Sequence, residues 1–198
     1  MFWELDWHSA VEYQKQELCR RVDSMSAEDF GKGTLDELAK RFAAEFALEP
    51  PTIFPENIEV SHREVEIDIS GARHRDFSRR GPHYMKGTAI DVRLPFEGDK
   101  EMFRVKPSTF NYSPPRGQAK REHVEFTIQG VNLTKEQVKA EIDERVMAIS
   151  EYLNFQAKSI GNFPNEIRQV AYQALEQRQK KLHADTDMIS GLGYRVRE

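Results

Sequence analysis

The spacing of apolar residues predicts that the first quarter of the chain is helical. Apolar side chains recur every three to four positions, or at multiples of that spacing, at Trp7, Val11, Leu18 and Val22. Thr34 and Glu37 form a capping box, and the apolar positions that follow lie between residues 35 and 46. Pro50 and Pro51 end this helix because neither ring can donate a backbone hydrogen bond. The sequence therefore predicts two N-terminal helices.

After residue 51 the apolar period changes from about 3.6 to two. Apolar residues alternate with charged or polar ones at 58–60, 65–69, 90–94 and 124–128, and the short stretch 102–105 is also strand-like. Glycine- and proline-containing turns separate these stretches, and none of the connections is long enough for a crossover helix. The pattern predicts an antiparallel meander of four or five strands with one buried face.

The helical period returns in the last third of the chain. Thr134 and Gln137 form a second capping box, and apolar residues then recur through 138–153 and 167–182, with Gly161 and Pro164 between the two runs. Each predicted helix has about 20–25 residues, or about 30–38 Å at 1.5 Å per residue. The apolar stripes are narrow, which favours packing of these helices on another subunit or domain.

These elements together predict an α+β fold with two N-terminal helices, a four- to five-stranded antiparallel sheet and a long C-terminal helical hairpin. We expect residues 1–133 to form the helix pair and the sheet, and residues 134–198 to form the hairpin, packed on or projecting from the same domain.

Composition excludes several classes of protein. The chain has 198 residues, of which 31% are charged, against about 25% in an average globular domain. No run of eighteen apolar residues is present, and the first residues lack the basic segment of a secretory signal. The single cysteine, Cys19, excludes an intramolecular disulfide and fits a reducing compartment. We therefore predict a cytoplasmic protein with no membrane association.

The net charge of −4 is unevenly distributed. Residues 1–50 carry −5, whereas residues 71–86 carry +4 and contain Phe77 and Tyr84 among their basic residues. Arginines and aromatic rings together suit a phosphate backbone with unpaired bases. The candidate contacts to nucleic acid or phosphate are Arg73, Arg75, Arg79, Arg80, Lys86 and Arg116. Arg116 joins the basic patch of residues 71–86 if its loop and the 71–86 loop emerge at one end of the sheet. The alternative is a solvated loop that pairs with the acidic helices or with a partner protein.

No motif specifies a catalytic site. The histidines lack metal-ligand spacing, so we expect no metal and no cofactor. Asp91, with acids on neighbouring strands, would be central to a metal-dependent nuclease, but an acid two residues before Lys106 is missing. Cys19 beside Arg20 and Arg21 is either an activated thiol or a small buried apolar residue. The sequence leaves enzymatic activity open and favours its absence.

A resemblance bears on function. It rests on the long helical pair, the exit Leu192-Gly193-Tyr194 and the stretches Leu94-Pro95-Phe96-Glu97-Gly98-Asp99, Phe103-Arg104, Lys106-Pro107-Ser108-Thr109 and Pro114-Pro115-Arg116. Through these features residues 55–198 are similar to the N-terminal module of uncharacterised bacterial proteins. In those proteins a restriction-endonuclease-like domain follows the module. The resemblance implies a sensor or assembly role in prokaryotic defence or nucleic-acid processing, and it supplies no catalytic residues.

The leading hypothesis is therefore a non-enzymatic sensor or assembly module that binds a protein partner or a second copy through its C-terminal helices. The alternatives are a nucleic-acid-binding domain that uses the basic 71–86 loop and, third, a metal-dependent nuclease.

Overall fold

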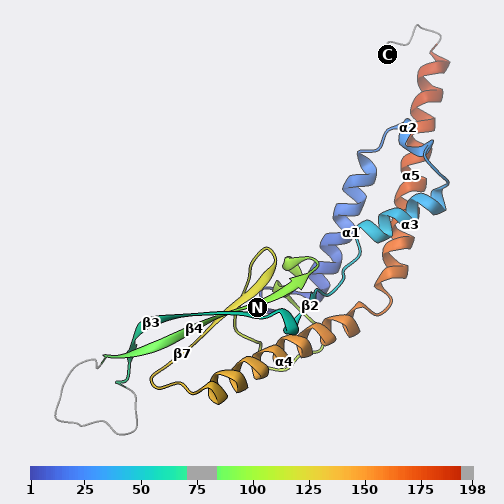
Figure 1. Cartoon of the computed structure of the whole chain (residues 1–198). Helices are drawn as coiled ribbons and strands as arrows, with labels where there is room; N and C mark the ends of the chain where they lie inside the picture. The colour runs from blue at the N-terminus through green and yellow to red at the C-terminus, as the bar shows by residue number, and fades with distance from the viewer. Residues whose placement is uncertain (71–83, 193–198) are drawn as a thin grey trace. The chain divides into compact units, whose positions relative to one another are not determined.

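The chain folds into two compact units in a computed structural model that describes residues 1–70 and 84–192 (Figure 1). The sheet unit comprises residues 1–5 and 50–157, and the helical unit comprises residues 6–49 and 158–198. The predicted α+β class is confirmed, with an antiparallel sheet, N-terminal helices and two long C-terminal helices.

The longest strand, β4 (Tyr84–Glu97), is the centre of the sheet. One of its edges pairs with β2 (Thr52–Ile53) and β3 (Glu59–Asp68), and the other pairs with β7 (His123–Gly130), which also pairs with β6 (Gln118–Ala119). All these pairs are antiparallel, and Val92 lies opposite both Val60 and Phe126. Short elements complete the set: β1 (Leu5–Asp6), the 3₁₀ helices η1 (Pro55–Asn57) and η2 (Lys100–Arg104), and β5 (Val105–Lys106).

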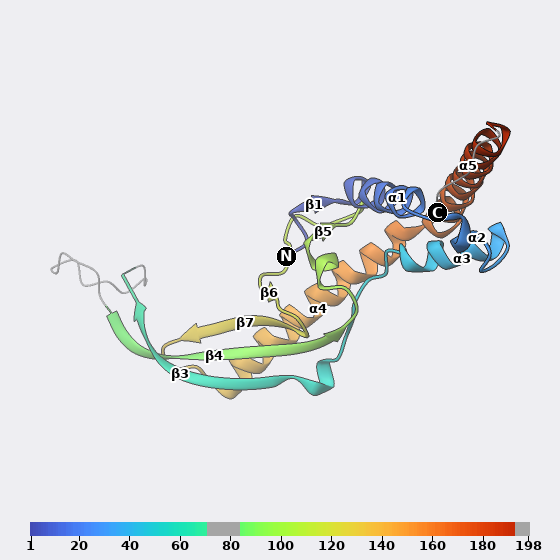
Figure 2. The same ribbon diagram turned by 90° about the horizontal axis from the view of Figure 1, so that it is seen from above.

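One face of this sheet is buried against α4 (Lys135–Ile160), as Figure 2 shows. Along β7 every second residue is buried, which is the period-two pattern expected from the sequence. The core joins Val92, Leu94, Val124, Phe126 and Ile128 of the sheet to Ile149, Tyr152 and Leu153 of α4. Phe2 and Phe103 close the same core, with ring centroids 5.6 Å apart.

The expectation of a strand at residues 102–105 is wrong for most of that stretch. Residues 100–104 form η2, and only Val105 lies in a strand. Gly98 turns the chain with φ at +110°, and the Asp99 side chain then accepts a hydrogen bond from the Glu101 backbone N–H at 2.9 Å. Met102 and Phe103 are both buried, which successive positions of a strand facing one core cannot achieve.

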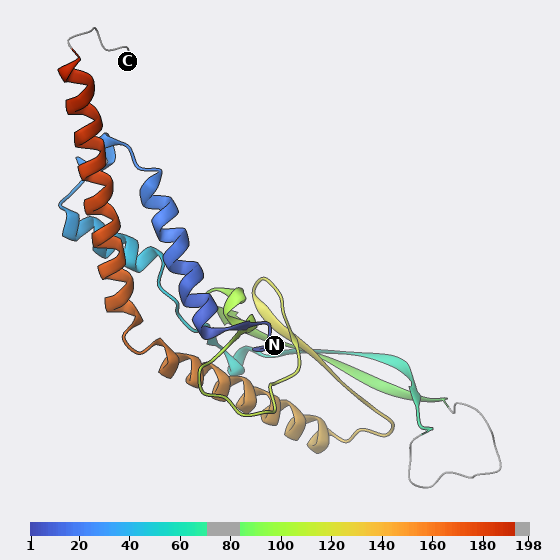
Figure 3. The same ribbon diagram turned by 180° about the vertical axis from the view of Figure 1, so that it is seen from behind.

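The helical unit contains α1 (Trp7–Asp23), α2 (Ala27–Phe30), α3 (Leu35–Glu45) and α5 (Phe163–Gly191). In Figure 3, α1 and α3 lie beside the first half of α5. The fully buried residues on this half are Ile167, Ala171 and Leu175. Arg168 donates to Asp36 of α3 at 2.6 Å, and the Arg178 guanidinium donates to the Met25 carbonyl oxygen at 2.8 and 3.0 Å.

Local sequence signals set the helix ends. Both predicted capping boxes form: Thr34 with Glu37 at the start of α3, and Thr134 with Gln137 at the start of α4. Gly161, with φ at +47°, separates α4 from α5. The two long helices belong largely to different units, so their pairing as a hairpin, like the domain boundary after residue 133, stays a prediction. Within the described ranges, no helix combines the length and apolar character needed to cross a membrane.

We predict that Gln156→Met destabilises the sheet unit. The fully buried Gln156 side chain donates to the carbonyl oxygens of Met102 and Val105, both at 2.7 Å. Methionine fills a similar volume but removes both hydrogen bonds, so that the Met102 carbonyl keeps only the bond from the Val105 N–H. The loss of two buried hydrogen bonds costs about 2 kcal/mol. Urea unfolding should show this loss in the free energy of unfolding. The matched control is the exposed Gln177→Met, and equal stability of the two variants would contradict the prediction.

Candidate functional site

The structure describes two of the six predicted anion-contact residues. Arg73, Arg75, Arg79 and Arg80 lie outside the described residues. Lys86 lies in the exposed first part of β4, and its ammonium is 3.6 Å from the Glu64 carboxylate on β3. The Lys86 and Glu64 side chains are 80% and 76% exposed, so this ion pair contributes little to stability.

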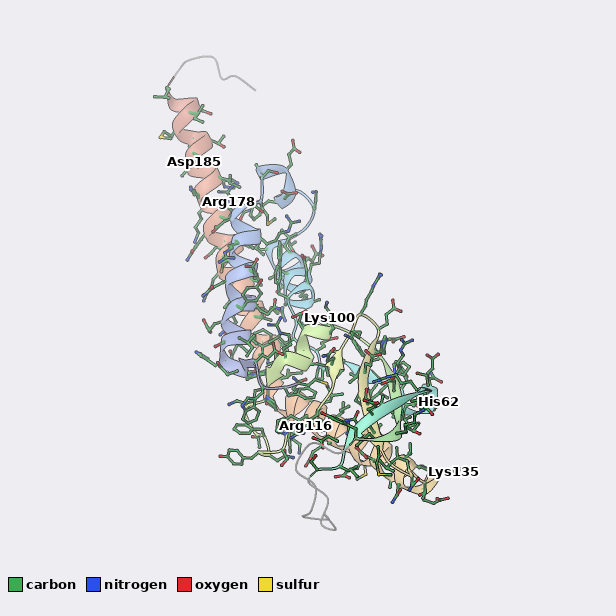
Figure 4. The ribbon with its side chains drawn as sticks, turned by 90° about the vertical axis from the view of Figure 1, so that its left-hand side faces the viewer. His62, Lys100, Arg116, Lys135, Arg178 and Asp185 are labelled. Atoms are coloured by element: carbon green, nitrogen blue, oxygen red, sulfur yellow. The ribbon has the colours of Figure 1, made fainter. Side chains whose placement is uncertain are left out.

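Arg116 is exposed and precedes β6. It lines two neighbouring hollows together with Arg145 of α4 (Figure 4 labels Arg116). The Arg145 guanidinium is occupied, since it pairs with Glu141 at 2.5 Å and lies 5.1 Å from the Phe126 ring centroid. Among the described residues no acidic side chain pairs with Arg116, so its donors are available to an anion.

Lys86 and Arg116 do not form one patch. Residues 71–83 join β3 to β4 between Asp68 and Tyr84, which are paired at one end of the sheet. The β6–β7 turn instead follows Ala119, whose partner Val124 pairs with Leu94 near the other end of β4. Gln118 pairs with Glu125, and Glu125 pairs with Arg93. Arg116, two residues before Gln118, therefore lies near the level of Asp91, roughly 16 Å along β4 from Lys86 at 3.3 Å per residue. Of the predicted contacts that the structure describes, Lys86 and Arg116 therefore lie at separate places along the sheet, and whether Arg116 joins the other four arginines stays a prediction.

Asp91, the central acid of the nuclease hypothesis, is engaged in the sheet. Its carboxylate accepts from Arg63 Nε at 2.9 Å and from the Thr127 hydroxyl at 2.6 Å, across both neighbouring strands. The Arg63 hydrogen bond, with help from Thr127, lowers the pKa of this carboxyl below its ordinary value of 3.8. These contacts give Asp91 a structural role in joining β3, β4 and β7.

The structure also bears on the metal-site and reactive-cysteine hypotheses. The described residues contain no group of three His, Cys, Asp or Glu side chains placed to hold a metal ion. Burial, followed by the nearby Asp23 carboxylate, raises the pKa of the Cys19 thiol above its ordinary value. A raised pKa disfavours the thiolate, which favours the interpretation of Cys19 as a small, partly buried apolar residue over that of an activated thiol.

The C-terminal part of α5 is exposed among the described residues. We call residues 180–192 the α5 end. All of these residues are exposed except Leu182, which is half-buried, although the helix continues to Gly191. Met188, Ile189 and Leu192 are 62%, 42% and 61% exposed. In Figure 4 the helix continues past Arg178 and Asp185 with its side chains clear of the other described elements of the helical unit. The sequence predicted that this helix is long but not where its packing stops.

We predict that Asp91→Asn reduces the acid sensitivity of the fold. A carboxylate whose pKa is lower in the folded protein contributes stability above its unfolded pKa, and that contribution is lost as the pH falls through the folded pKa. The Tm of the variant should therefore be lower at neutral pH and should fall less on acidification than the Tm of the wild type. Asp143→Asn on α4 removes the same charge away from Arg63 and Thr127, and it is the control. Parallel pH profiles for Asp91→Asn and the wild type would refute this account.

No protein-family model, no curated protein and no solved structure matches this chain. The resemblance to the bacterial N-terminal modules therefore stays an expectation.

Proposed function

We propose that this chain is an assembly module in which the α5 end pairs antiparallel with the α5 end of a second copy. The observation that carries the proposal is that the apolar stripe of α5 continues past the part of the helix that other described residues bury. Ala171, Leu175, Leu182, Ile189 and Leu192 lie on one stripe at spacings of three, four or seven. The first two are fully buried and the last two are exposed.

The α5 end is poorly suited to stand alone as a helix. Residues 183–191 read His-Ala-Asp-Thr-Asp-Met-Ile-Ser-Gly, of which only Ala and Met are strong helix formers. Relative to alanine, the other seven cost roughly 4 kcal/mol of helix stability. Packing normally compensates such a deficit, and the described residues supply none here. We therefore infer that a covering partner stabilises this part of the helix.

The order of charges favours a second copy as that partner. The exposed residues Lys180 and Lys181 begin the α5 end, and the exposed residues Asp185 and Asp187 follow within seven positions. No basic residue lies in the last turn, so the acids face the negative end of the helix dipole without compensation. Of these charges, Lys181 and Asp185 flank the apolar stripe, whereas Lys180 and Asp187 lie on the opposite face of the helix. An antiparallel copy packed on the stripe places its Lys181 beside this Asp185 and its Asp185 beside this Lys181. A parallel copy opposes like charges, which is unfavourable.

An assembly role is consistent with the sensor or assembly function that the resemblance implies. Its setting in prokaryotic defence or nucleic-acid processing stays a prediction. The nucleic-acid alternative through the 71–86 loop and the nuclease alternative also stay predictions, although Asp91 now has a structural explanation.

We predict that the full chain forms a concentration-dependent dimer, and that charge reversal in the α5 end weakens it. Lys180→Glu/Lys181→Glu makes the α5 end wholly acidic, and Asp185→Lys/Asp187→Lys makes it wholly basic. Each variant should dissociate at concentrations at least about tenfold higher than the wild type, because like charges are opposed. An equimolar mixture of the two should pair more tightly than either alone. Sedimentation velocity over a concentration series measures all three.

The control reverses the same charge elsewhere. Lys135→Glu/Lys139→Glu lies on exposed positions of α4 and should leave the association unchanged. A wild-type chain that stays monomeric throughout the series excludes the proposal. So does a dimer whose affinity is insensitive both to the charge reversals and to Ile189→Glu.

A further inference from the structure

An aromatic and basic cluster in the sheet unit is independent of the α5 end. It consists of Trp3, Lys106, Phe110 and Tyr112. The Trp3 and Phe110 rings meet edge to face with centroids 5.2 Å apart, and Phe110 and Tyr112 do the same at 5.6 Å. The Lys106 ammonium lies 4.9 Å from the Trp3 centroid and 4.5 Å from the Phe110 centroid.

The rings of this cluster are presented to solvent. Tyr112 is 88% exposed and Trp3 is 46% exposed, whereas Phe2, beside Trp3, is fully buried. Phe2 has φ at +57°, a conformation that is rare for a bulky residue and costs on the order of 1–3 kcal/mol. Its N–H donates to the Phe103 carbonyl at 2.5 Å, and the next-but-one residue, Glu4, donates to Arg104 at 3.0 Å. The strained backbone is thus fixed on both sides of an outward-facing tryptophan.

The segment that carries the other two rings is fixed in the same way. Asn111 lies between Phe110 and Tyr112, and hydrogen bonds hold it against α4. The Tyr152 hydroxyl donates to the Asn111 backbone carbonyl and to its side-chain oxygen, the latter at 2.9 Å. The Asn111 amide donates to Glu151 at 3.0 Å. Exposed rings on an anchored backbone lose little conformational entropy when a ligand stacks on them.

Lys106 supplies charge without a counter-ion. Within residues 1–70 and 84–192 no carboxylate forms an ion pair with its ammonium, so its N–H donors are free for an anionic ligand. The same ammonium occupies the position over Trp3 and Phe110 that a cationic ligand would need, and it would repel such a ligand. The cluster therefore selects an anion that also carries flat, stackable groups.

We propose that Trp3, Lys106, Phe110 and Tyr112 form a binding site for single-stranded nucleic acid. Unpaired bases stack on the open faces of Tyr112 and Trp3, and Lys106 contacts a phosphate of the same strand. Proteins that bind single strands without sequence preference combine exposed aromatic rings with basic groups in this manner. The proposal uses only described residues and is separate from the arginines of the 71–86 loop.

The test is fluorescence anisotropy of a labelled oligo-dT strand titrated with the full chain. Tyr112→Ala and Trp3→Ala should each weaken binding about tenfold or more, because each removes a stacking face. Tyr112→Phe keeps the ring and should bind as the wild type does. Lys106→Ala should weaken binding and reduce the salt dependence by about one phosphate contact, whereas Lys106→Arg should restore both. Tyr13→Ala, an exposed aromatic on α1, is the matched control and should bind normally.

Two further measurements make the test decisive. In a Trp7→Phe background, where Trp3 is the remaining tryptophan, oligo-dT should quench the fluorescence because a base stacks on the indole. Duplex DNA of the same length should bind more weakly, since its bases are already stacked. The proposal is overturned if oligo-dT does not bind, or if binding is lost only when Arg73, Arg75, Arg79 and Arg80 are replaced together. Equal affinity for duplex DNA, or binding of a proline-rich peptide in place of oligo-dT, also overturns it.

Discussion

In the sheet unit, one buried amide determines how the segment that carries the aromatic cluster leaves the core. Gln156 of α4 donates to the carbonyl oxygens of Met102, in η2, and of Val105, at the start of β5, at 2.7 Å each. Without this partner each carbonyl would lose a buried hydrogen bond, and the Met102 carbonyl would keep only the bond from the Val105 N–H, which is costly. Because Val105 is held in this way, Lys106 follows at a defined place beside Trp3. The polar tie and the apolar core around Phe103 thus fix one segment from both sides.

The two units use apolar surface in different ways. The sheet unit places its alternating residues on one face and closes it with α4, Phe2 and Phe103, so the period of two has a complete explanation within the unit. In the helical unit the buried residues of α5 lie between Phe163 and Leu175, where α1 and α3 pack, and partial cover continues to Arg178 and Leu182. Both long helices have narrow stripes, but only the stripe of α5 continues, at Ile189 and Leu192, where none of the described residues buries it.

What the sequence could predict follows from the range of each interaction. The capping boxes at Thr34 and Thr134 join residues three apart, and strand alternation is equally local, so both were predictable. The stretch 102–105 was misread because buried Met102 and Phe103 look like a strand, while the turn at Gly98 and the Asp99 cap decide for a 3₁₀ helix. The Trp3–Phe110 contact joins residues more than one hundred positions apart, and no local pattern signals it. The exposure of Ile189 could not be predicted either, because apolar residues have the same helical spacing around the buried Leu175 as around the exposed Ile189.

Charge explains why neither proposed surface needs a strongly basic protein. The net charge of −4 argues against a broad electrostatic attraction to nucleic acid, but the Lys106 cluster relies on stacking, and a single unpaired ammonium directs the phosphate. In the α5 end, two lysines followed by two aspartates have no net charge and are still self-complementary in one orientation. In both places the order and surroundings of a few charges matter more than their sum. Pairing of the α5 ends would hold two aromatic clusters in one assembly. A single strand that reaches both clusters would then bind more tightly than to one, because its second contact is intramolecular.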